Sequence, residues 1–125
     1  DSMNYLKMFQ QLSNETRMRI VALLMQNELC VCGLEEILNI RQVNISKHLG
    51  KLKEANIVDS RRDKQRIFYF LTESFVNHEH LLNHIEEVMI EDEKLIKDHE
   101  ALLLHDETKE NKIYVCKAFK KENLS

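Results

Sequence analysis

The chain has 125 residues, 31% of them charged, and a formal net charge of −3, so it has room for one modest hydrophobic core. No stretch approaches the roughly 18 uninterrupted apolar residues of a membrane span, and no signal peptide is recognised, so we expect a cytoplasmic protein that does not enter a membrane. The lack of proline, the two glycines and the 43% hydrophobic residues favour a largely helical body. Three unevenly spaced cysteines do not form a disulfide framework, which agrees with a reducing compartment.

The first half of the chain predicts four helices. Apolar residues at helical spacing indicate a helix over 3–12 and, after a cap at Ser13 or Asn14, a second over 16–26. Two further helices are expected over 31–39 and 42–55, separated by a short polar turn. In the fourth helix three apolar residues share one face, which we expect to pack inward: Ile45, Leu49 and Leu52.

The opposite face of the fourth helix carries groups that suit duplex DNA. Amides, a hydroxyl and long cations near a helix N-terminus can contact base edges in the major groove and the flanking phosphates. The same residues would also suit an ordinary solvated helix face. The candidate DNA-reading residues are Gln42, Val43, Asn44, Ser46, Lys47 and Lys51.

The segment after the fourth helix favours DNA binding over a merely solvated face. Asn56 is suited to a left-handed helix cap, and residues 58–62 and 66–71 then alternate like two strands of a β-hairpin. Such a hairpin tip can lie along a phosphate backbone or enter a minor groove. Four cations surround the tip: Arg61, Arg62, Lys64 and Arg66. Together these elements predict a winged helix-turn-helix on duplex DNA.

Charge is distributed unevenly along the chain. Residues 41–66 hold eight Lys or Arg and three acids, a net +5, whereas residues 73–107 hold eleven acids and two Lys, a net −9. Because DNA affinity depends on the local field, the negative total does not argue against nucleic acid.

An ordered set of motifs from about Met8 to Leu71 resembles the ArsR/SmtB family of winged-helix bacterial repressors, which respond to metals, metalloids or thiol chemistry. The set comprises Glu28-Leu29-Cys30-Val31-Cys32, Gln42, Ile45-Ser46-Lys47-His48-Leu49, Lys51-Leu52, Ala55-Asn56-Ile57-Val58, Arg61-Arg62 and residues 67–71. The resemblance implies a repressor that reads its operator with Gln42, Val43, Ser46, Lys47 and the wing arginines.

The C-terminal part is expected to form one long helix over about 74–104, capped by Ser74. Its apolar positions alternate spacings of three and four, as in a coiled-coil seam. Because such a helix is longer than a small core can cover, we expect the first and last helices to pair two subunits. A two-fold homodimer places two recognition helices one DNA turn apart and predicts an inverted-repeat operator.

The expected fold is therefore mainly α with a small β-hairpin, as one winged-helix domain over 1–125 with an extended C-terminal helix and tail. Residues 112–119 of the tail alternate in polarity and are expected to form a strand or a docked extension.

Cys30 and Cys32 stand at the start of the third helix. Thiolates there can both reach one soft ion, and the helix dipole is expected to lower the thiol pKa. Two sulfurs do not complete a site, and Cys116 is the remaining thiol that could add a ligand. The candidate inducers are arsenite, cadmium, lead or zinc. Thiol oxidation or persulfide chemistry and plain apolar packing of the cysteines remain alternatives.

Histidines provide a second candidate metal site. His80 and His84 lie one helical turn apart, with His78 or Glu87 nearby, although histidines on a charged helix are more often solvated. His48 is instead expected to pack or to form a hydrogen bond.

The pattern thus predicts a transcriptional repressor whose DNA binding is released by a thiol-directed inducer. The alternatives are a DNA-binding protein that senses nothing and a protein-interaction module. Without a glycine-rich phosphate loop, a nucleophile elbow or a His-Glu-x-x-His motif, the chain is not expected to be an enzyme.

Overall fold

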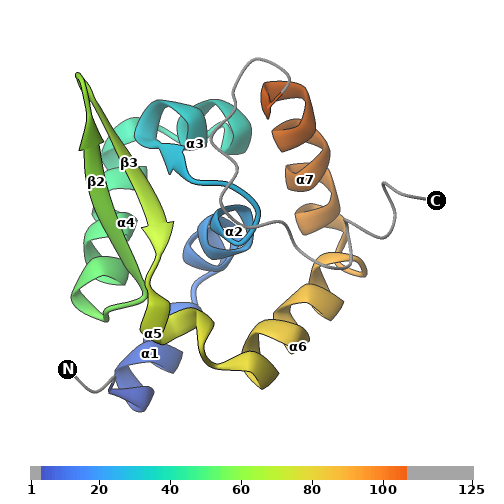
Figure 1. The fold of residues 1–125 in the computed structure, drawn as a ribbon. Helices are drawn as coiled ribbons and strands as arrows, with labels where there is room; N and C mark the ends of the chain where they lie inside the picture. Colours follow the sequence, from blue (N-terminus) through green and yellow to red (C-terminus); the bar gives the residue numbers. More distant parts are fainter. Residues whose placement is uncertain (1–3, 107–125) are drawn as a thin grey trace.

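The structure, a computed structural model, describes residues 4–106 (Figure 1). Figure 1 shows α2 near the centre, with the hairpin and α4 on one side and α6 and α7 on the other. The elements in chain order are α1 (Tyr5–Leu12), α2 (Glu15–Leu24), β1 (Leu29–Cys30), α3 (Val31–Leu38), α4 (Gln42–Glu54), β2 (Val58–Asp63), β3 (Arg66–Leu71), α5 (Glu73–Val76), α6 (Glu79–Met89) and α7 (Glu93–Asp106).

The four helices predicted for the first half are confirmed, with ends within two residues of those expected. Asn4 and Asn14 cap α1 and α2 through side-chain oxygens that accept a backbone N–H. Asn39 ends α3 in the left-handed conformation, with φ 56°. The apolar face of α4 is buried in the common core as predicted, so its polar face is turned outward.

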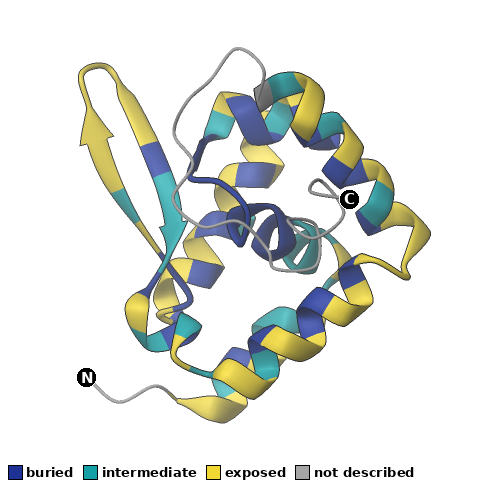
Figure 2. Ribbon diagram, turned by 45° about the vertical axis from the view of Figure 1, so that its right-hand side comes forward, coloured by how far each residue is buried: buried dark blue, intermediate teal, exposed yellow. Residues whose placement is uncertain are grey.

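The predicted hairpin is also confirmed, and a third strand that the sequence did not reveal extends it. β2 pairs with β3, and the turn between them has Lys64 at φ 59°. The two-residue strand β1 pairs with the other edge of β3 and sets Cys30 opposite Phe68. The start of the thiol motif is therefore hydrogen-bonded into the same sheet as the wing. Figure 2 shows the exposed hairpin tip and the buried segment that leads into β1.

The prediction of one continuous C-terminal helix is wrong. Thr72, not Ser74, caps the short α5 by accepting the N–H of Phe75, and the chain bends again between α6 and α7. At that second bend the Asp92 carboxylate accepts the N–H of Leu95 at 3.0 Å, as an N-cap does. The chain therefore turns back after α6, and α7 packs against α2 and α3.

The expected coiled-coil seam is consequently used within the chain. Leu82, Ile85 and Met89 of α6 belong to the main hydrophobic cluster. Polar contacts also fix α7: the Arg19 guanidinium donates to both carboxylate oxygens of Asp98 at 2.9 Å. Among residues 4–106, none of the helices combines the length and apolarity needed to cross a membrane.

Candidate nucleic-acid interface and thiol site

The outward face of α4 presents every residue that the sequence singled out there. Those side chains are exposed, and they stand above the buried Ile45, Leu49 and Leu52: Gln42, Val43, Asn44, Ser46, Lys47 and Lys51. Val43 is apolar yet 71% exposed, so it has no packing role among the described residues. A bare aliphatic group on such a face can contact a thymine methyl group.

Contacts to α2 and α3 fix the position of α4. The backbone N–H of Gln42 donates to a carboxylate oxygen of Glu35 at 3.2 Å, which supplies the cap that Arg41 lacks. His48 lies 3.1 Å from a guanidinium nitrogen of Arg17, measured at its Nδ1 atom. Burial first, and the charge of Arg17 next, lower the pKa of His48 below its ordinary value. The expected hydrogen-bonding role of His48 is therefore confirmed.

The four wing cations do not all have the same surroundings. Arg62, Lys64 and Arg66 are exposed, whereas Arg61 pairs with the carboxylate of Glu28, whose side chain is only 2% exposed. The Arg61 guanidinium also lies over the Phe68 ring, 5.2 Å from its centre. Arg61 thus ties the wing to the segment before β1. The sequence analysis included Glu28 only in the thiol motif and did not predict this pair, although an acid beside an apolar stretch is a signal for one.

The two thiols of the third-helix start are in direct contact. Cys30 is buried, and its Sγ atom caps α3 by accepting the N–H of Gly33 at 3.3 Å. Cys32 is exposed, and its Sγ atom lies 2.7 Å from that of Cys30. One thiol is therefore part of the sheet and the helix cap, while the other is open to ligands.

The expectation of a lowered thiol pKa is wrong for Cys32. Contact with the Cys30 thiol, followed by burial, raises the pKa of Cys32 above its ordinary value, and the charge of Arg66 opposes this only in part. A second thiolate beside the first would be repelled by it. Cys32 is consequently less nucleophilic at neutral pH than an isolated thiol at a helix start.

An open hollow of about 840 Å³ surrounds the thiols. It brings α3, the wing and α7 together: Cys30, Cys32, Gly33, Glu35, Glu36, Asn39, Arg66, Leu104 and His105 line it. His105 was not predicted, because no local motif links it to a cysteine pair so far back in the chain. Its Nδ1 atom lies 2.6 Å from a carboxylate oxygen of Glu36. Cys116 and the predicted strand or extension over 112–119 fall outside the described residues.

The second predicted metal site receives less support. His84 is exposed and its Nδ1 atom lies 3.6 Å from a carboxylate oxygen of Glu87, which makes a helix-surface pair. Between residues 4 and 106, no three His, Cys, Asp or Glu side chains are already arranged to hold a metal ion. Any metal site in this part of the chain must therefore close around its ion.

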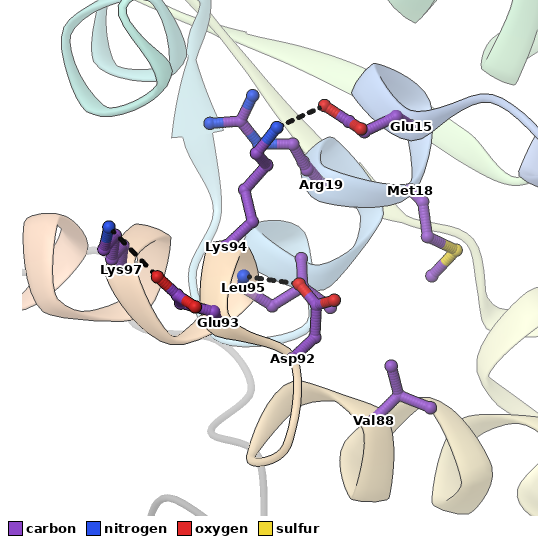
Figure 3. Close-up of a pocket in the computed structure, with 9 residues that line it drawn as sticks. All are labelled: Glu15, Met18, Arg19, Val88, Asp92, Glu93, Lys94, Leu95 and Lys97. Atoms are coloured by element: carbon purple, nitrogen blue, oxygen red, sulfur yellow. Dashed lines mark hydrogen bonds and ion pairs between the residues drawn. The ribbon is translucent and has the colours of Figure 1, made fainter.

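A separate groove of about 550 Å³ lies where α2 meets the bend between α6 and α7 (Figure 3). Ion pairs occupy its walls, as Lys94 donates to Glu15 at 2.8 Å and Lys97 lies 3.5 Å from Glu93. Figure 3 shows both pairs together with the apolar side chains of Met18, Val88 and Leu95, which also line the groove. The ion pair between Lys94 and Glu15 in this groove connects the start of α7 to α2.

Comparison with known proteins defines the class that this fold and interface represent. Residues 14–60 match the family model described as bacterial regulatory protein, arsR family. The cadmium resistance transcriptional regulatory protein CadC of Listeria innocua is 41% identical over 64 residues, 50% of this chain and 54% of that protein. The arsenic resistance transcriptional regulator of Pseudomonas putida is 42% identical over 64 residues, 50% of each chain.

Among solved structures, the transcriptional repressor BigR of Xylella fastidiosa superposes with a TM-score of 0.60 and 32% identity, over 71% of this chain and 86% of that chain. The chain is a winged helix-turn-helix protein, and it belongs to the arsR family of bacterial regulatory proteins. The match spans about half the length of the curated relatives. These relatives are named as transcriptional regulators, not enzymes.

Proposed function

We propose that the chain is a sequence-specific transcriptional repressor whose release from its operator is triggered by a soft metal or metalloid ion at Cys30 and Cys32. The observation that carries the DNA-binding part is the exposed polar face of α4, with its apolar face buried and its start held by Glu35. The exposed wing cations extend this surface for phosphates. The names of the cadmium and arsenic resistance relatives support the class of inducer.

A binding experiment separates base reading from phosphate anchoring. Operator sites are selected from a random duplex library, and fluorescence anisotropy measures affinity for a selected site and for random DNA. Gln42→Ala or Ser46→Ala should weaken the selected site by about 1–3 kcal/mol and random DNA far less. Arg62→Ala or Lys64→Ala should weaken both DNAs and reduce the salt dependence by about one unit per lost phosphate contact.

The matched control is Lys97→Ala, which removes an exposed cation from α7 without touching α4 or the wing. It should leave both affinities unchanged, because its charge lies away from the proposed interface. Equal losses from the α4 and wing variants, on both DNAs, would refute the assignment of α4 as the reading helix.

The sheet supports a route from the thiols to the wing. Cys30 pairs with Phe68 in β3, and Glu28 two residues earlier binds Arg61 in β2. An ion that pulls on both sulfurs therefore acts on β1 and on the start of α3, and α3 leads into α4. Cys30→Ser and Cys32→Ser proteins should bind the operator but stay bound when arsenite, cadmium, lead or zinc is added. Normal release of both variants by every ion would refute the sensor.

Oxidation or persulfide formation at the thiols is the alternative trigger, and the same titrations include an oxidant and a persulfide donor. Release by these reagents but by no metal ion would replace the metal proposal with a redox one. Binding that no reagent changes would leave a regulator without a thiol sensor.

We also propose a homodimer on an inverted-repeat operator. α1 supports this because Leu6 is 83% exposed and Phe9 is also exposed on the same helix. An apolar stripe of this kind is suited to a subunit interface. Leu6→Glu should shift the protein to a monomer in sedimentation and abolish binding to the full inverted repeat, while Lys97→Ala should not. A wild-type monomer at micromolar concentration would contradict the dimer.

A further inference from the structure

We propose that His105 of α7 is the third protein ligand of the Cys30–Cys32 site, which would then bind a zinc or cadmium ion through two thiolates and one imidazole. This role depends on the proposed thiol sensor, whose two sulfurs need at least one more protein ligand. His105 replaces Cys116 in that role.

Gly33 has no side chain, which leaves space for His105 to lie close to the thiols. A Cβ atom on Gly33 would lie 3.3 Å from His105 Nε2 and 3.7 Å from Cys30 Sγ. Both donor atoms thus border the small space that a glycine leaves open at this point of α3. Cys32 Sγ adjoins Cys30 Sγ at 2.7 Å, so all three donors border one hollow.

Glu36 prepares the imidazole for this role. Its carboxylate lies 2.6 Å from His105 Nδ1, which makes Nδ1 the donor in the neutral ring and puts the basic lone pair on Nε2. Metal-binding histidines usually donate their other ring N–H to a carboxylate in this manner, which fixes the tautomer and the ring orientation. The hydrogen-bonded nitrogen faces Glu36, and Nε2 is the atom near Gly33.

The chemistry of the donors selects the ion. Two sulfurs and one imidazole nitrogen suit a tetrahedral zinc or cadmium ion with a water or another ligand in fourth place. At zinc–sulfur distances of about 2.3 Å, two thiolates in such a site lie about 3.8 Å apart. The 2.7 Å contact must therefore open by about 1 Å, so the site closes around its ion rather than waiting preformed.

Closure would join two parts of the chain that also meet in the sheet and the core. His105 lies at the end of α7, and α7 is fixed to α2 by the Arg19–Asp98 pair. A bound ion would tie this helix to the start of α3, next to β1. Zinc or cadmium would consequently contact α7 through His105 as well as α3 through the thiols. A reagent that binds only two sulfurs would not contact His105.

The test compares two probes on the reduced full chain. Zinc affinity is measured by competition with a chromophoric chelator, and phenylarsine oxide, which needs only two thiols, is titrated in parallel. His105→Gln should weaken zinc binding by about 10–100-fold or more, and Glu36→Ala by about tenfold, because ligands and their carboxylate partners both support affinity. Neither should change phenylarsine oxide binding. His84→Gln is the matched control, since it removes a histidine with its own carboxylate partner.

Two further measurements do not depend on affinity. Cobalt bound to the wild-type protein should show thiolate-to-cobalt charge-transfer bands and the d–d bands of tetrahedral cobalt. His105→Gln should keep the charge-transfer bands but change the d–d bands. Zinc should also shift the ¹⁵N resonance of His105 Nε2.

Gly33→Ala, which crowds Nε2 but keeps all three donors, should weaken the binding of zinc more than the binding of phenylarsine oxide.

Two results would overturn the inference. Zinc affinity in His105→Gln equal to wild type would do so, and so would zinc binding that Cys116→Ser abolishes while His105→Gln leaves it intact. In either case loss of the inducer response in Cys30→Ser and Cys32→Ser would leave the proposed thiol sensor standing. Unchanged zinc binding and unchanged DNA release in both cysteine variants would instead refute that sensor.

Discussion

The joint between α2 and α7 offers a sharp test of how the C-terminal helix is held. Arg19 donates from two nitrogens to both carboxylate oxygens of Asp98, each at 2.9 Å, with side chains 16% and 7% exposed. Asp98→Asn keeps the shape of the side chain but removes its charge. It also turns an amide N–H toward a guanidinium that can only donate. The perturbation therefore isolates the ion pair from packing.

The magnitude follows from burial. Removing one partner of a buried pair costs about 3–5 kcal/mol, because the other charge is left without compensation. Arg19 retains some contact with water and lies near Glu15, so we expect about 2–3 kcal/mol for Asp98→Asn. For a chain of this size that lowers Tm by about 10 °C. Arg19→Met should cost more, since it strands a carboxylate that is better buried than the guanidinium.

Urea unfolding followed by far-UV circular dichroism, at one fixed protein concentration, measures these losses. The double variant Arg19→Met with Asp98→Leu replaces both charges by apolar groups and should lie within about 1 kcal/mol of wild type. Lys94→Met breaks an exposed pair in the same groove (Figure 3) and should have no measurable effect. A negligible loss in Asp98→Asn, or a double variant no more stable than Arg19→Met alone, would refute the reasoning.

Four shorter predictions concern the interface and its supports. Glu28→Gln should release Arg61 for phosphate contact and steepen the salt dependence of DNA binding by about 0.9, measured by anisotropy across a salt series. Asn56, at φ 61°, should tolerate glycine, whereas Asn56→Val should cost about 1–2 kcal/mol in urea unfolding. The fold lowers the pKa of His48, so the unfolded chain binds more protons than the folded one between that lowered pKa and about 6.5. The free energy of unfolding should therefore fall as pH drops below about 6.5. His48→Gln should flatten this pH dependence. Cys30→Ala should weaken operator binding more than Cys30→Ser, since serine caps a helix and alanine does not.

Local signals in the sequence sufficed to predict the elements of the proposed DNA interface. The spacing of Ile45, Leu49 and Leu52 depends only on the helical period, and the alternation of residues 66–71 only on the strand period. Both patterns lie within single elements, so neither required knowledge of the tertiary fold. The left-handed Asn56 was predictable for the same reason, because its conformation is a property of one residue in one helix end.

Contacts between distant segments were not predictable. The break before α7 was missed because the spacing of apolar residues continues through it. Asp92 caps α7 only in the folded protein, where α7 packs against other helices. β1 was missed since two residues are too short for a strand pattern, and their pairing depends on β3. His105 lies far along the chain from the cysteines, so only the fold of α7 onto α3 brings it near them.

Cys30 combines two structural roles, and this bears on how an inducer could release DNA. A ligand shifts an equilibrium only by its differential affinity for the two states, typically about 1–3 kcal/mol for coupled sites. In the structure the Cys30 sulfur caps α3, and the same residue pairs with the wing strand at Phe68. A cation that engages this sulfur weakens the cap, and a helix cap contributes about 0.5–2 kcal/mol. The energy available from one cap is thus comparable with the coupling that the proposed thiol sensor needs. Because the cap lies between β1 and α3, the helix that precedes α4, its loss would act on the wing and on the proposed reading helix together.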